Sequence, residues 1–245
     1  MKTYAISDLH GCFDIYEQVS AFLGPNDKVF CLGDCTDRGP EPWRTLRAVI
    51  KDKRFEYLLG NHEDMLLQAL TDTFSDYTDD TYGQLYKNGG KQTHDECLTD
   101  PEVVGIFRYM QHFPTKHLYK NANGVDVYLS HSGLYSPLCE NPNAHDLMWS
   151  RGHFANEMPE GKYVVVHGHT PIQYMSQMFL KKSPYAPVGV VPPNFFEKIS
   201  AETDMPALIY ANGHKINIDL GTYKSGRSVL LDLDTFEQFI FTCKV

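Results

Sequence analysis

Residues 28–39, with the sequence KVFCLGDCTDRG, contain the pattern on which the fold of this chain depends. The first five residues form a short apolar run that is typical of a β-strand. Two carboxylates and a guanidinium follow closely, at Asp34, Asp37 and Arg38. Polar residues in this position lie beyond the carboxyl edge of a sheet, where open α/β sheets bind their ligands. We therefore expect a binding site at the end of this strand.

The same pattern occurs four more times along the 245 residues. Strand-like runs at 3–7, 55–59, 125–130 and 163–166 each end in carboxylate, amide or imidazole side chains. These groups are DLHG at 8–11, GNHE at 60–63, His131, and HGH at 167–169. A single group of this kind can be accidental, but five in series indicate one site built from several strand ends.

Segments of helical period separate the first three strands. Apolar residues are spaced i, i+3, i+7 from 16 to 23 and again from 43 to 50, and a third helix begins near Met65. Gly24-Pro25 ends the first of these helices, and Pro42 suits the first turn of the second. The alternation of strand and helix predicts a mostly parallel sheet with right-handed crossovers.

Residues 71–116 interrupt this alternation. Residues 71–80 are polar and acidic, and two helical stretches follow, one around 82–86 and one from Asp100-Pro101 to Met110. We expect a helical cap inserted in the α/β body. Beyond it, Asn123-Gly124 and Asn212-Gly213 predict hairpins, and residues 228–231 and 239–241 predict strands. The proline-rich stretch 181–206 is expected to form a long surface loop.

The composition excludes several classes of protein. The chain has 22 basic and 31 acidic residues, a net charge of −9 and no Lys/Arg-rich run, so we do not expect it to track nucleic acid. No apolar run approaches the ~18 residues of a membrane helix. The first residues, MKTYAIS, are too polar for a signal peptide and lead into a strand. We therefore expect a cytoplasmic protein whose six cysteines, which form no CxxC pair, are reduced.

The side chains at the strand ends form a consistent set of metal ligands: Asp8, His10, Asp34, Asn61, His131 and His169. Carboxylate, amide and imidazole donors without a thiolate suit Mn, Fe, Zn, Co or Ni. Six ligands are too many for one catalytic metal that keeps an open position, but they fit two metals with a shared carboxylate. Asp34 is the natural bridge because it lies between the other ligands in chain order. Two such ions stabilise the attacking and leaving oxygens of an in-line displacement at phosphorus.

Residues beside these ligands fit the same chemistry. Arg38 and Arg151 offer planar guanidinium groups that bind phosphate oxygens through two hydrogen bonds at once. His62, next to a proposed ligand, is a candidate to protonate the leaving oxygen, with Asp37 orienting its ring. We therefore predict phosphate binding and general acid catalysis around the metals.

This series of motifs resembles that of calcineurin-like metallophosphoesterases, and more closely the phosphoprotein phosphatase branch in its small bacterial and phage form. The motifs follow the family's order over residues 8–169. The last one, Gly168-His169-Thr170-Pro171, lacks the second histidine of the broader superfamily, which favours this branch. The resemblance implies an α/β fold, a four-layer β-sandwich flanked by helices. It also implies that residues 1–245 form a single domain, with the helical cap at about 71–116.

The resemblance implies a role for each matched residue. The ligands of the first metal are Asp8, His10 and Asp34. Those of the second are Asp34, Asn61, His131 and His169. The phosphate is bound by Arg38, Asn61 and Arg151, and the acid dyad is His62 with Asp37. Two divalent ions are implied, with Mn²⁺ as the first choice and Fe, Zn, Co or Ni as alternatives. Asp219 and Gly221 resemble a closing motif of the same small phosphatases.

Three neighbouring residues have less defined roles. Ser7 stands where many relatives have glycine, a change that we expect to have little consequence. Cys35 follows the bridging ligand and suggests a redox-sensitive thiol, although a small buried filler is the favoured interpretation. His167 is expected to have either a supporting or a purely buried role.

The leading hypothesis is a dinuclear-metal-dependent phosphatase that hydrolyses phosphoserine or phosphothreonine in proteins by in-line attack of a metal-bridging hydroxide. The alternative is a diadenosine-tetraphosphate hydrolase on the same scaffold. A third hypothesis is an inactive binding module, whose sequence mark is a lost ligand, and none of the ligands is missing here. We expect a phosphorylated protein or a small phosphoester as partner, and neither nucleic acid nor a membrane.

Overall fold

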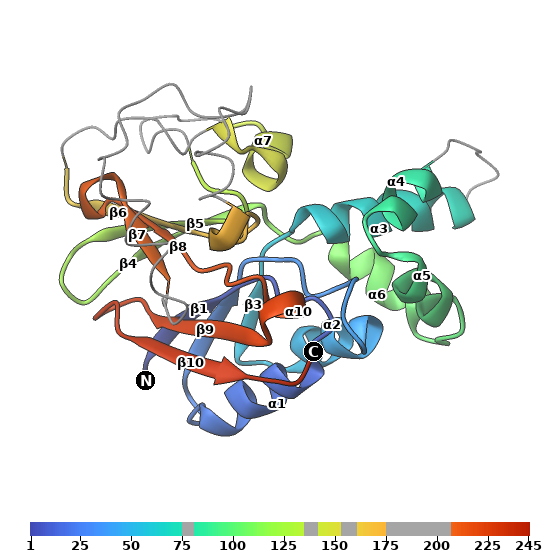
Figure 1. The fold of residues 1–245 in the computed structure, drawn as a ribbon, viewed down its shortest axis with the longest axis horizontal. Helices are drawn as coiled ribbons and strands as arrows, with labels where there is room; N and C mark the ends of the chain where they lie inside the picture. Colours follow the sequence, from blue (N-terminus) through green and yellow to red (C-terminus); the bar gives the residue numbers. More distant parts are fainter. Residues whose placement is uncertain (75–80, 135–141, 153–160, 175–206) are drawn as a thin grey trace.

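Two five-stranded sheets pack face to face in the computed structural model, which describes residues 1–74, 81–134, 142–152, 161–174 and 207–245 (Figure 1). The order of the first sheet is β10 (Gln238–Thr242), β9 (Arg227–Asp232), β1 (Thr3–Ile6), β2 (Lys28–Cys31) and β3 (Phe55–Tyr57). The order of the second is β4 (Lys116–Lys120), β5 (Asp126–Ser130), β6 (Tyr163–His167), β8 (Lys215–Asn217) and β7 (Leu208–Tyr210).

Both sheets are mixed. The strands β1, β2 and β3 are parallel, as are β5, β6 and β8, but β9, β10, β4 and β7 add antiparallel edges. The prediction of one mostly parallel sheet is therefore wrong, and the β-sandwich implied by the resemblance is confirmed. Short connections explain the difference: the turn at 121–125 joins β4 to β5, and the 3₁₀ turn Ala211–Gly213 joins β7 to β8. Such short links can only join antiparallel strands.

The inner strands β1, β2, β6 and β9 are buried on both faces, which explains why they appear as continuous apolar runs in the sequence. Between the sheets, Ala5 and Phe30 of the first sheet belong to one core with Val127, Leu129 and Val166 of the second. Alternate residues of the first sheet belong to a second core, with helices on the outer face: Tyr4, Ile6, Val29, Cys31 and Leu230.

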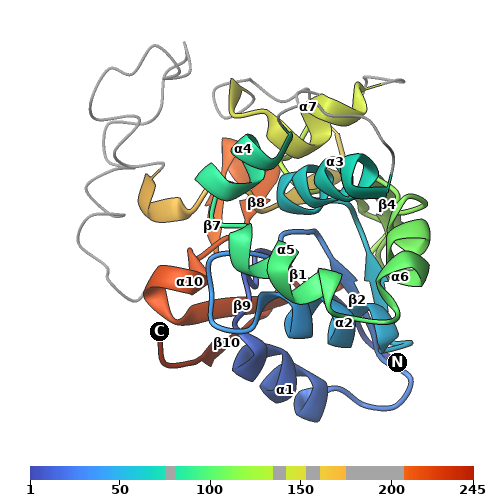
Figure 2. The same ribbon diagram turned by 90° about the vertical axis from the view of Figure 1, so that its right-hand side faces the viewer.

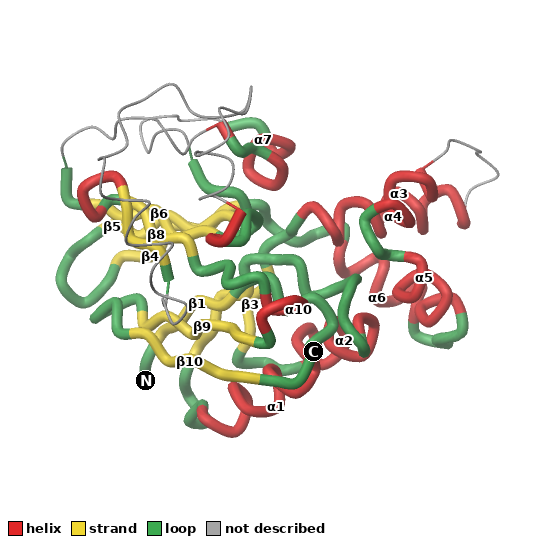
Figure 3. Tube along the Cα trace, in the orientation of Figure 1, coloured by secondary structure: helices red, strands yellow, loops and turns green. Residues whose placement is uncertain are grey.

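Helices cover the outer faces of the sandwich and give it four layers (Figure 3). The helices α1 (Phe13–Phe22) and α2 (Pro42–Lys51) lie under the first sheet, as the sequence predicts. On the second sheet, Leu147 of α7 (Ala144–Trp149) packs against Val165 of β6. The short helix α10 (Thr222–Ser225) precedes β9. No helix in the described part of the chain is both long and apolar enough to cross a bilayer.

The predicted helical cap lies to one side of the sandwich, and Figure 2 shows it facing the viewer. It contains the far end of α3 (Asn61–Phe74), then α4 (Thr81–Lys87), α5 (Lys91–Leu98) and α6 (Val103–Met110). The sequence predicts a break from residue 71 and only two helices, but α3 continues to Phe74 and α5 is an additional helix. Its polar sequence, which buries only Thr93, His94 and Cys97, explains why periodicity does not reveal it. That residues 1–245 form one domain stays a prediction, and the predicted loop at 181–206 lies outside the described residues.

Candidate metal centre

The loops that follow the parallel strands are joined to one another by backbone hydrogen bonds. The N–H of Asp8 donates to the carbonyl of Gly33 at 3.1 Å, and that of His10 donates to the carbonyl of Asp34 at 2.9 Å. In the second sheet, the N–H of Gly168 donates to the carbonyl of His131 at 2.8 Å. The strand register therefore brings the predicted ligands side by side at one edge of the sandwich.

The backbone at this edge is unusual. Eight non-glycine residues in the described part of the chain have a positive φ, and six of them are predicted site residues: Asp8, His10, Asp34, Asp37, Arg38 and His169. The left-handed conformation costs an L-residue roughly 1–2 kcal/mol. Such strain is concentrated at functional sites, where the surrounding structure holds it. Here it belongs to the same turns that bring polar side chains from neighbouring positions into one pocket.

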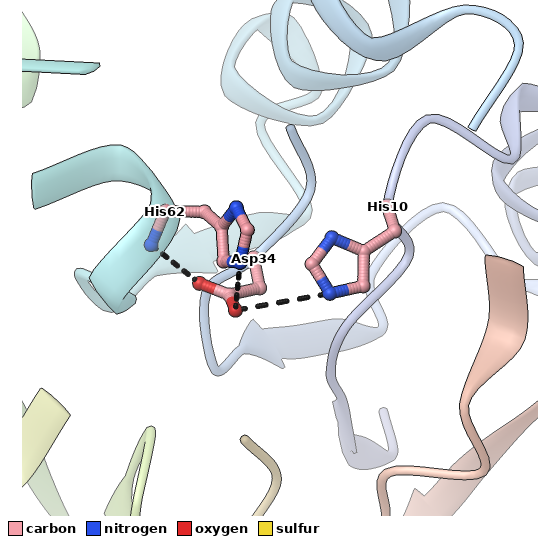
Figure 4. A group of neighbouring side chains, drawn as sticks. All are labelled: His10, Asp34 and His62. Atoms are coloured by element: carbon pink, nitrogen blue, oxygen red, sulfur yellow. Dashed lines mark hydrogen bonds and ion pairs between the residues drawn. The ribbon is translucent and has the colours of Figure 1, made fainter. Parts of the chain in front are cut away.

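Asp34 lies at the centre of the pocket (Figure 4). Its Oδ2 is 3.8 Å from Nε2 of His10, 3.9 Å from Nε2 of His62 and 3.3 Å from Nε2 of His131. Its Oδ1 accepts a hydrogen bond of 3.0 Å from the backbone N–H of His62. One carboxylate thus faces imidazoles from both sheets, which is the arrangement expected of a bridging ligand.

Two groups of donor atoms share Asp34. One contains His10, Asp34 and His62, and the other contains Asp34, His131 and His169, with the donor atoms of each group within 4.8 Å of one another. The two groups share Asp34, as the predicted division into two metal sites does. They differ from that prediction in two respects: the first group includes His62, the predicted acid, and Asp8 is in neither group.

The tautomers of two histidines are fixed by backbone carbonyls. Nδ1 of His10 lies 2.8 Å from the carbonyl of Thr36, and Nδ1 of His131 lies 2.7 Å from the carbonyl of Leu32. Because a carbonyl can only accept, each Nδ1 carries a proton and each Nε2 of the neutral ring presents a lone pair to the pocket. Metal-binding histidines are oriented in the same way, because the ring nitrogen that does not face the metal donates its hydrogen to a carbonyl or carboxylate.

The acceptors in the pocket require a cation. Nε2 of His131 lies 2.9 Å from Oδ1 of Asn61 and 3.3 Å from Oδ2 of Asp34, so three electron-rich atoms converge. Without a metal ion the only cation that can meet this demand is a proton: burial lowers the pKa of His131, but the charge of Asp34 outweighs it and raises this pKa to about 10. Nε2 of His62 and Nε2 of His169 are also buried without any hydrogen-bond partner in the described structure. The residues present therefore fit a pair of divalent metal ions.

Asp8 lies behind these donors. Its Oδ2 accepts hydrogen bonds from the Ser7 hydroxyl and, at 3.0 Å, from the backbone N–H of His169. The expectation that Ser7 has little consequence is therefore wrong. Burial, together with the charge of Asp34, raises the pKa of the Asp8 carboxyl to about 6. A Cβ at Gly168 would lie 2.1 Å from the same oxygen, so only glycine fits there.

A buried glutamate, which sequence reasoning did not assign to the site, holds the central loop. Oε2 of Glu63 accepts a hydrogen bond of 2.7 Å from the N–H of Asp34, and Oε1 accepts bonds of 3.0 Å and 3.2 Å from the N–H groups of Cys35 and Thr36. The same Oε1 accepts a bond from the Thr36 hydroxyl at 3.1 Å. Four donors thus surround one carboxylate, and the signal for it is its place in the GNHE motif.

His62 and Asp37 are in direct contact, as predicted. Nδ1 of His62 lies 2.6 Å from Oδ2 of Asp37. Oδ1 of Asp37 accepts a hydrogen bond from the hydroxyl of Thr93, which in turn accepts one of 3.1 Å from the Asp37 N–H. Thr93 lies on α5 of the cap, and nothing in the sequence pattern points to it. The protonated Nδ1 leaves Nε2 of His62 directed at the pocket.

Both predicted arginines are exposed, and Arg38 lies at the entrance, where an exposed side chain meets the buried donors. Nη1 of Arg38 is 2.7 Å from Nε2 of His10, and its guanidinium lies 4.9 Å from the ring centre of Tyr223. Partial desolvation and the charge of Arg38 lower the pKa of Arg151, while Asp34 raises it. These interactions place Arg151 within electrostatic reach of the same pocket.

Three further predictions concern buried residues. Asp219 is buried, its Oδ1 accepts a 2.8 Å bond from the N–H of Gly221, and burial and Asp8 raise its pKa well above the usual value. The Cys35 thiol is buried 3.4 Å from that of Cys31, and burial raises its pKa well above the usual value, which fits the filler interpretation. His167 is buried and contacts the Tyr210 hydroxyl at 2.7 Å, which fits the buried role.

Comparison with known protein families shows to which family this chain belongs. The sequence profile of calcineurin-like phosphoesterases matches residues 1–202, and the chain therefore belongs to this family. The matched range contains both groups of donor atoms, in agreement with the dinuclear divalent metal centre that this family uses.

The curated proteins to which the chain is similar include symmetrical bis(5'-nucleosyl)-tetraphosphatases. The chain is 27% identical over 138 residues to a symmetrical bis(5'-nucleosyl)-tetraphosphatase of Delftia acidovorans, covering 55% of this chain and 45% of the relative. It is 27% identical over 190 residues to that of Legionella pneumophila, covering 74% and 58%. The chain thus spans about half the length of the curated relatives that it matches.

Solved structures share the fold. One described as a putative diadenosine tetraphosphatase has a TM-score of 0.60 at 14% identity, covering 99% of this chain and 94% of the other. A protein serine/threonine phosphatase from Saccharomyces cerevisiae has a TM-score of 0.55 at 14% identity, covering 100% and 80%. Both phosphatase types therefore share this architecture, and the fold does not separate them.

Proposed function

We propose that this chain is a dinuclear-metal-dependent hydrolase of dinucleoside polyphosphates, with diadenosine tetraphosphate as a representative substrate. The observation that supports the chemistry is the pair of donor groups sharing Asp34. The choice of substrate is supported by the relatives, whose matched region includes the same motifs. The sequence alone ranked a protein phosphatase first, and the comparisons favour the alternative.

The proposed ligand set is the one implied by the resemblance. Asp8, His10 and Asp34 would hold one ion, and the second would be held by Asp34, Asn61, His131 and His169. We propose Mn²⁺ as the first choice. When bound, two divalent ions supply a water of lowered pKa and neutralise the charge of the reacting phosphate.

The remaining residues bind the substrate and move a proton. Arg38 and Arg151, at the entrance, would bind the phosphate oxygens together with the Asn61 amide. Nε2 of His62 faces the pocket and would give its proton to the leaving phosphate oxygen. Asp37 accepts from the opposite nitrogen of that ring, so it stabilises the protonated imidazole and keeps the ring oriented.

A comparison of substrates tests this function. With Mn²⁺ present, we expect kcat/KM for diadenosine tetraphosphate to exceed that for a phosphoserine peptide. Symmetrical cleavage would yield two nucleoside diphosphates as the products. A higher value for the peptide would return the assignment to a protein phosphatase. Hydrolysis of neither substrate would refute both, and an Asp34→Asn variant controls for contaminating activity.

A further inference from the structure

Exposed cations lie near the metal centre of a chain whose net charge is negative. The chain has a net charge of −9, yet Arg38, Arg151 and Lys224 are all exposed near the same entrance. The two arginines already have a proposed role. Lys224 has none, and it belongs to the short helix α10 rather than to any motif loop.

Glycines on both sides position α10 beside the metal centre. Gly221 and Gly226 have φ values of 65° and 64°, which glycine adopts without strain, so the chain turns sharply before and after the helix. The ring of Tyr223 lies edge-on to His10, with 5.3 Å between ring centres. The helix is therefore in contact with a predicted metal ligand.

Lys224 is held by two tyrosines. Its Nζ donates a hydrogen bond to the hydroxyl of Tyr174. It lies 5.0 Å from the ring centre of Tyr174 and 5.3 Å from that of Tyr223. The hydrogen bond to Tyr174 raises the pKa of Lys224, which is charged at neutral pH. An exposed lysine with this many partners is fixed far better than one that extends freely into water.

One aromatic ring links this lysine to the phosphate-binding entrance. The guanidinium of Arg38 lies 4.9 Å from the centre of the Tyr223 ring, and Nζ of Lys224 lies 5.3 Å from the same centre. The guanidinium carbon of Arg38 and Nζ of Lys224 are therefore no farther apart than the sum of these two distances. Arg38 contacts His10 directly, whereas Lys224 reaches it only through Tyr223, so Lys224 is the outer of the two.

We propose that Lys224, fixed by Tyr174 and Tyr223, binds the second or third phosphate of a polyphosphate chain whose reacting phosphate lies at the metals. A single phosphate is neutralised at the metals and the arginines and needs no cation farther out. A linked polyphosphate carries its next negative charges beyond Arg38, where Lys224 is the next cation among the described residues. Lys224 is thus a specificity-determining residue, and this inference rests on the proposed function only for the identity of the natural substrate.

Binding of inorganic anions tests the proposal without requiring turnover. Calorimetric titrations of the Mn²⁺-loaded protein, with free Mn²⁺ in excess, would compare inorganic tripolyphosphate with inorganic phosphate. Lys224→Gln should weaken tripolyphosphate binding about tenfold, the size of one lost charge-assisted hydrogen bond, and leave phosphate binding within about twofold. Lys224→Arg should restore most of the loss. Lys120→Gln, a change at another exposed lysine paired with Asp126, is the matched control.

Two results would overturn the proposal: unchanged tripolyphosphate binding in Lys224→Gln, or an equal loss of phosphate and tripolyphosphate affinity. Thermal melting of each variant shows whether the fold is intact. Kinetics then separate this proposal from the proposed function. If the parent chain hydrolyses diadenosine tetraphosphate, Lys224→Gln should lower its kcat/KM about tenfold relative to that for p-nitrophenyl phosphate. If the parent does not hydrolyse it, the proposed function fails while the calorimetry still decides the role of Lys224.

Discussion

Nδ1 of His62 lies 2.6 Å from Oδ2 of Asp37, and the other nitrogen of the same ring is buried with no hydrogen-bond partner among the described residues. A carboxylate on one side of an imidazole fixes the tautomer and the orientation of the ring. The other nitrogen, Nε2, lies 3.9 Å from Oδ2 of Asp34, inside the candidate metal centre. This arrangement makes the acid role of His62 testable through its neighbour.

Asp37→Asn should lower kcat roughly 10²-fold for substrates with poor leaving groups, because general acid catalysis is worth about 10²–10⁴. For p-nitrophenyl phosphate, whose leaving group needs little protonation, the loss should be much smaller. Steady-state kinetics with phenyl and p-nitrophenyl phosphate measure this difference. Thr93→Val, which removes a hydrogen bond to Asp37 but keeps its charge, should show the same pattern with a smaller amplitude. Equal losses on both substrates would exclude acid catalysis by His62.

Removal of metal should destabilise the protein, because ligands from both sheets converge on the same pocket. Any ion that binds only the folded state stabilises it by mass action. Chelation should lower the Tm by several degrees, since about 1 kcal/mol corresponds to ~2–4 °C for a chain of this size. Differential scanning calorimetry before and after EDTA, followed by Mn²⁺, measures the shift.

The Asp34→Asn variant should lose most of this metal-dependent shift. His112→Gln, a change at an exposed histidine of the cap, should keep it. A shift that persists unaltered in Asp34→Asn would mean that the stabilising metal binds elsewhere.

Gly168→Ala should disrupt the metal centre. The added Cβ would lie 2.1 Å from Oδ2 of Asp8 and 2.1 Å from the hydroxyl of Ser7, and both must move. Metal content measured by mass spectrometry should fall below that of the parent, and activity should fall with it. Gly105→Ala in α6, where a Cβ meets no atom within 4 Å, is the matched control and should retain full metal content. Parent-like metal content in Gly168→Ala would show that Asp8 is not a ligand.

The free energy of unfolding should decrease in acid, because His167 is buried in its neutral form. Burial lowers its pKa from 6.5 to about 3, so between these values the unfolded chain binds a proton that the folded chain does not. Unfolding is therefore favoured as the pH falls from 6.5 towards 3, by up to about 1.4 kcal/mol per pH unit for one proton. Urea unfolding of the metal-free protein at pH 7, 6, 5 and 4 measures this slope. His167→Gln should be less stable at pH 7 but show a shallower slope, and an unchanged slope would assign the acid sensitivity to other groups.

Much of the site could be predicted from sequence because its ligands follow strands in short motifs. A parallel strand end fixes where the next residues lie, so Asp8, Asp34 and Asn61 needed no tertiary information. Glu63 has a signal in the GNHE motif, but its hydrogen bonds to the loop of Asp34 do not follow from that motif. Thr93 and Tyr223 contact the site only through packing between distant parts of the chain. Periodicity cannot reveal such contacts, and in α5 two of the three buried residues, Thr93 and His94, are themselves polar.

The left-handed backbone at the metal centre has a consequence for how such chains diverge. An L-residue in this conformation is tolerated only while its side chain is needed, whereas glycine adopts it freely. A descendant released from selection for catalysis would gain stability by exchanging these residues for glycine. Glycine at positions 8, 10, 34, 37, 38 and 169, in a chain that keeps its strands, would therefore mark a lineage that has abandoned the reaction but retained the architecture.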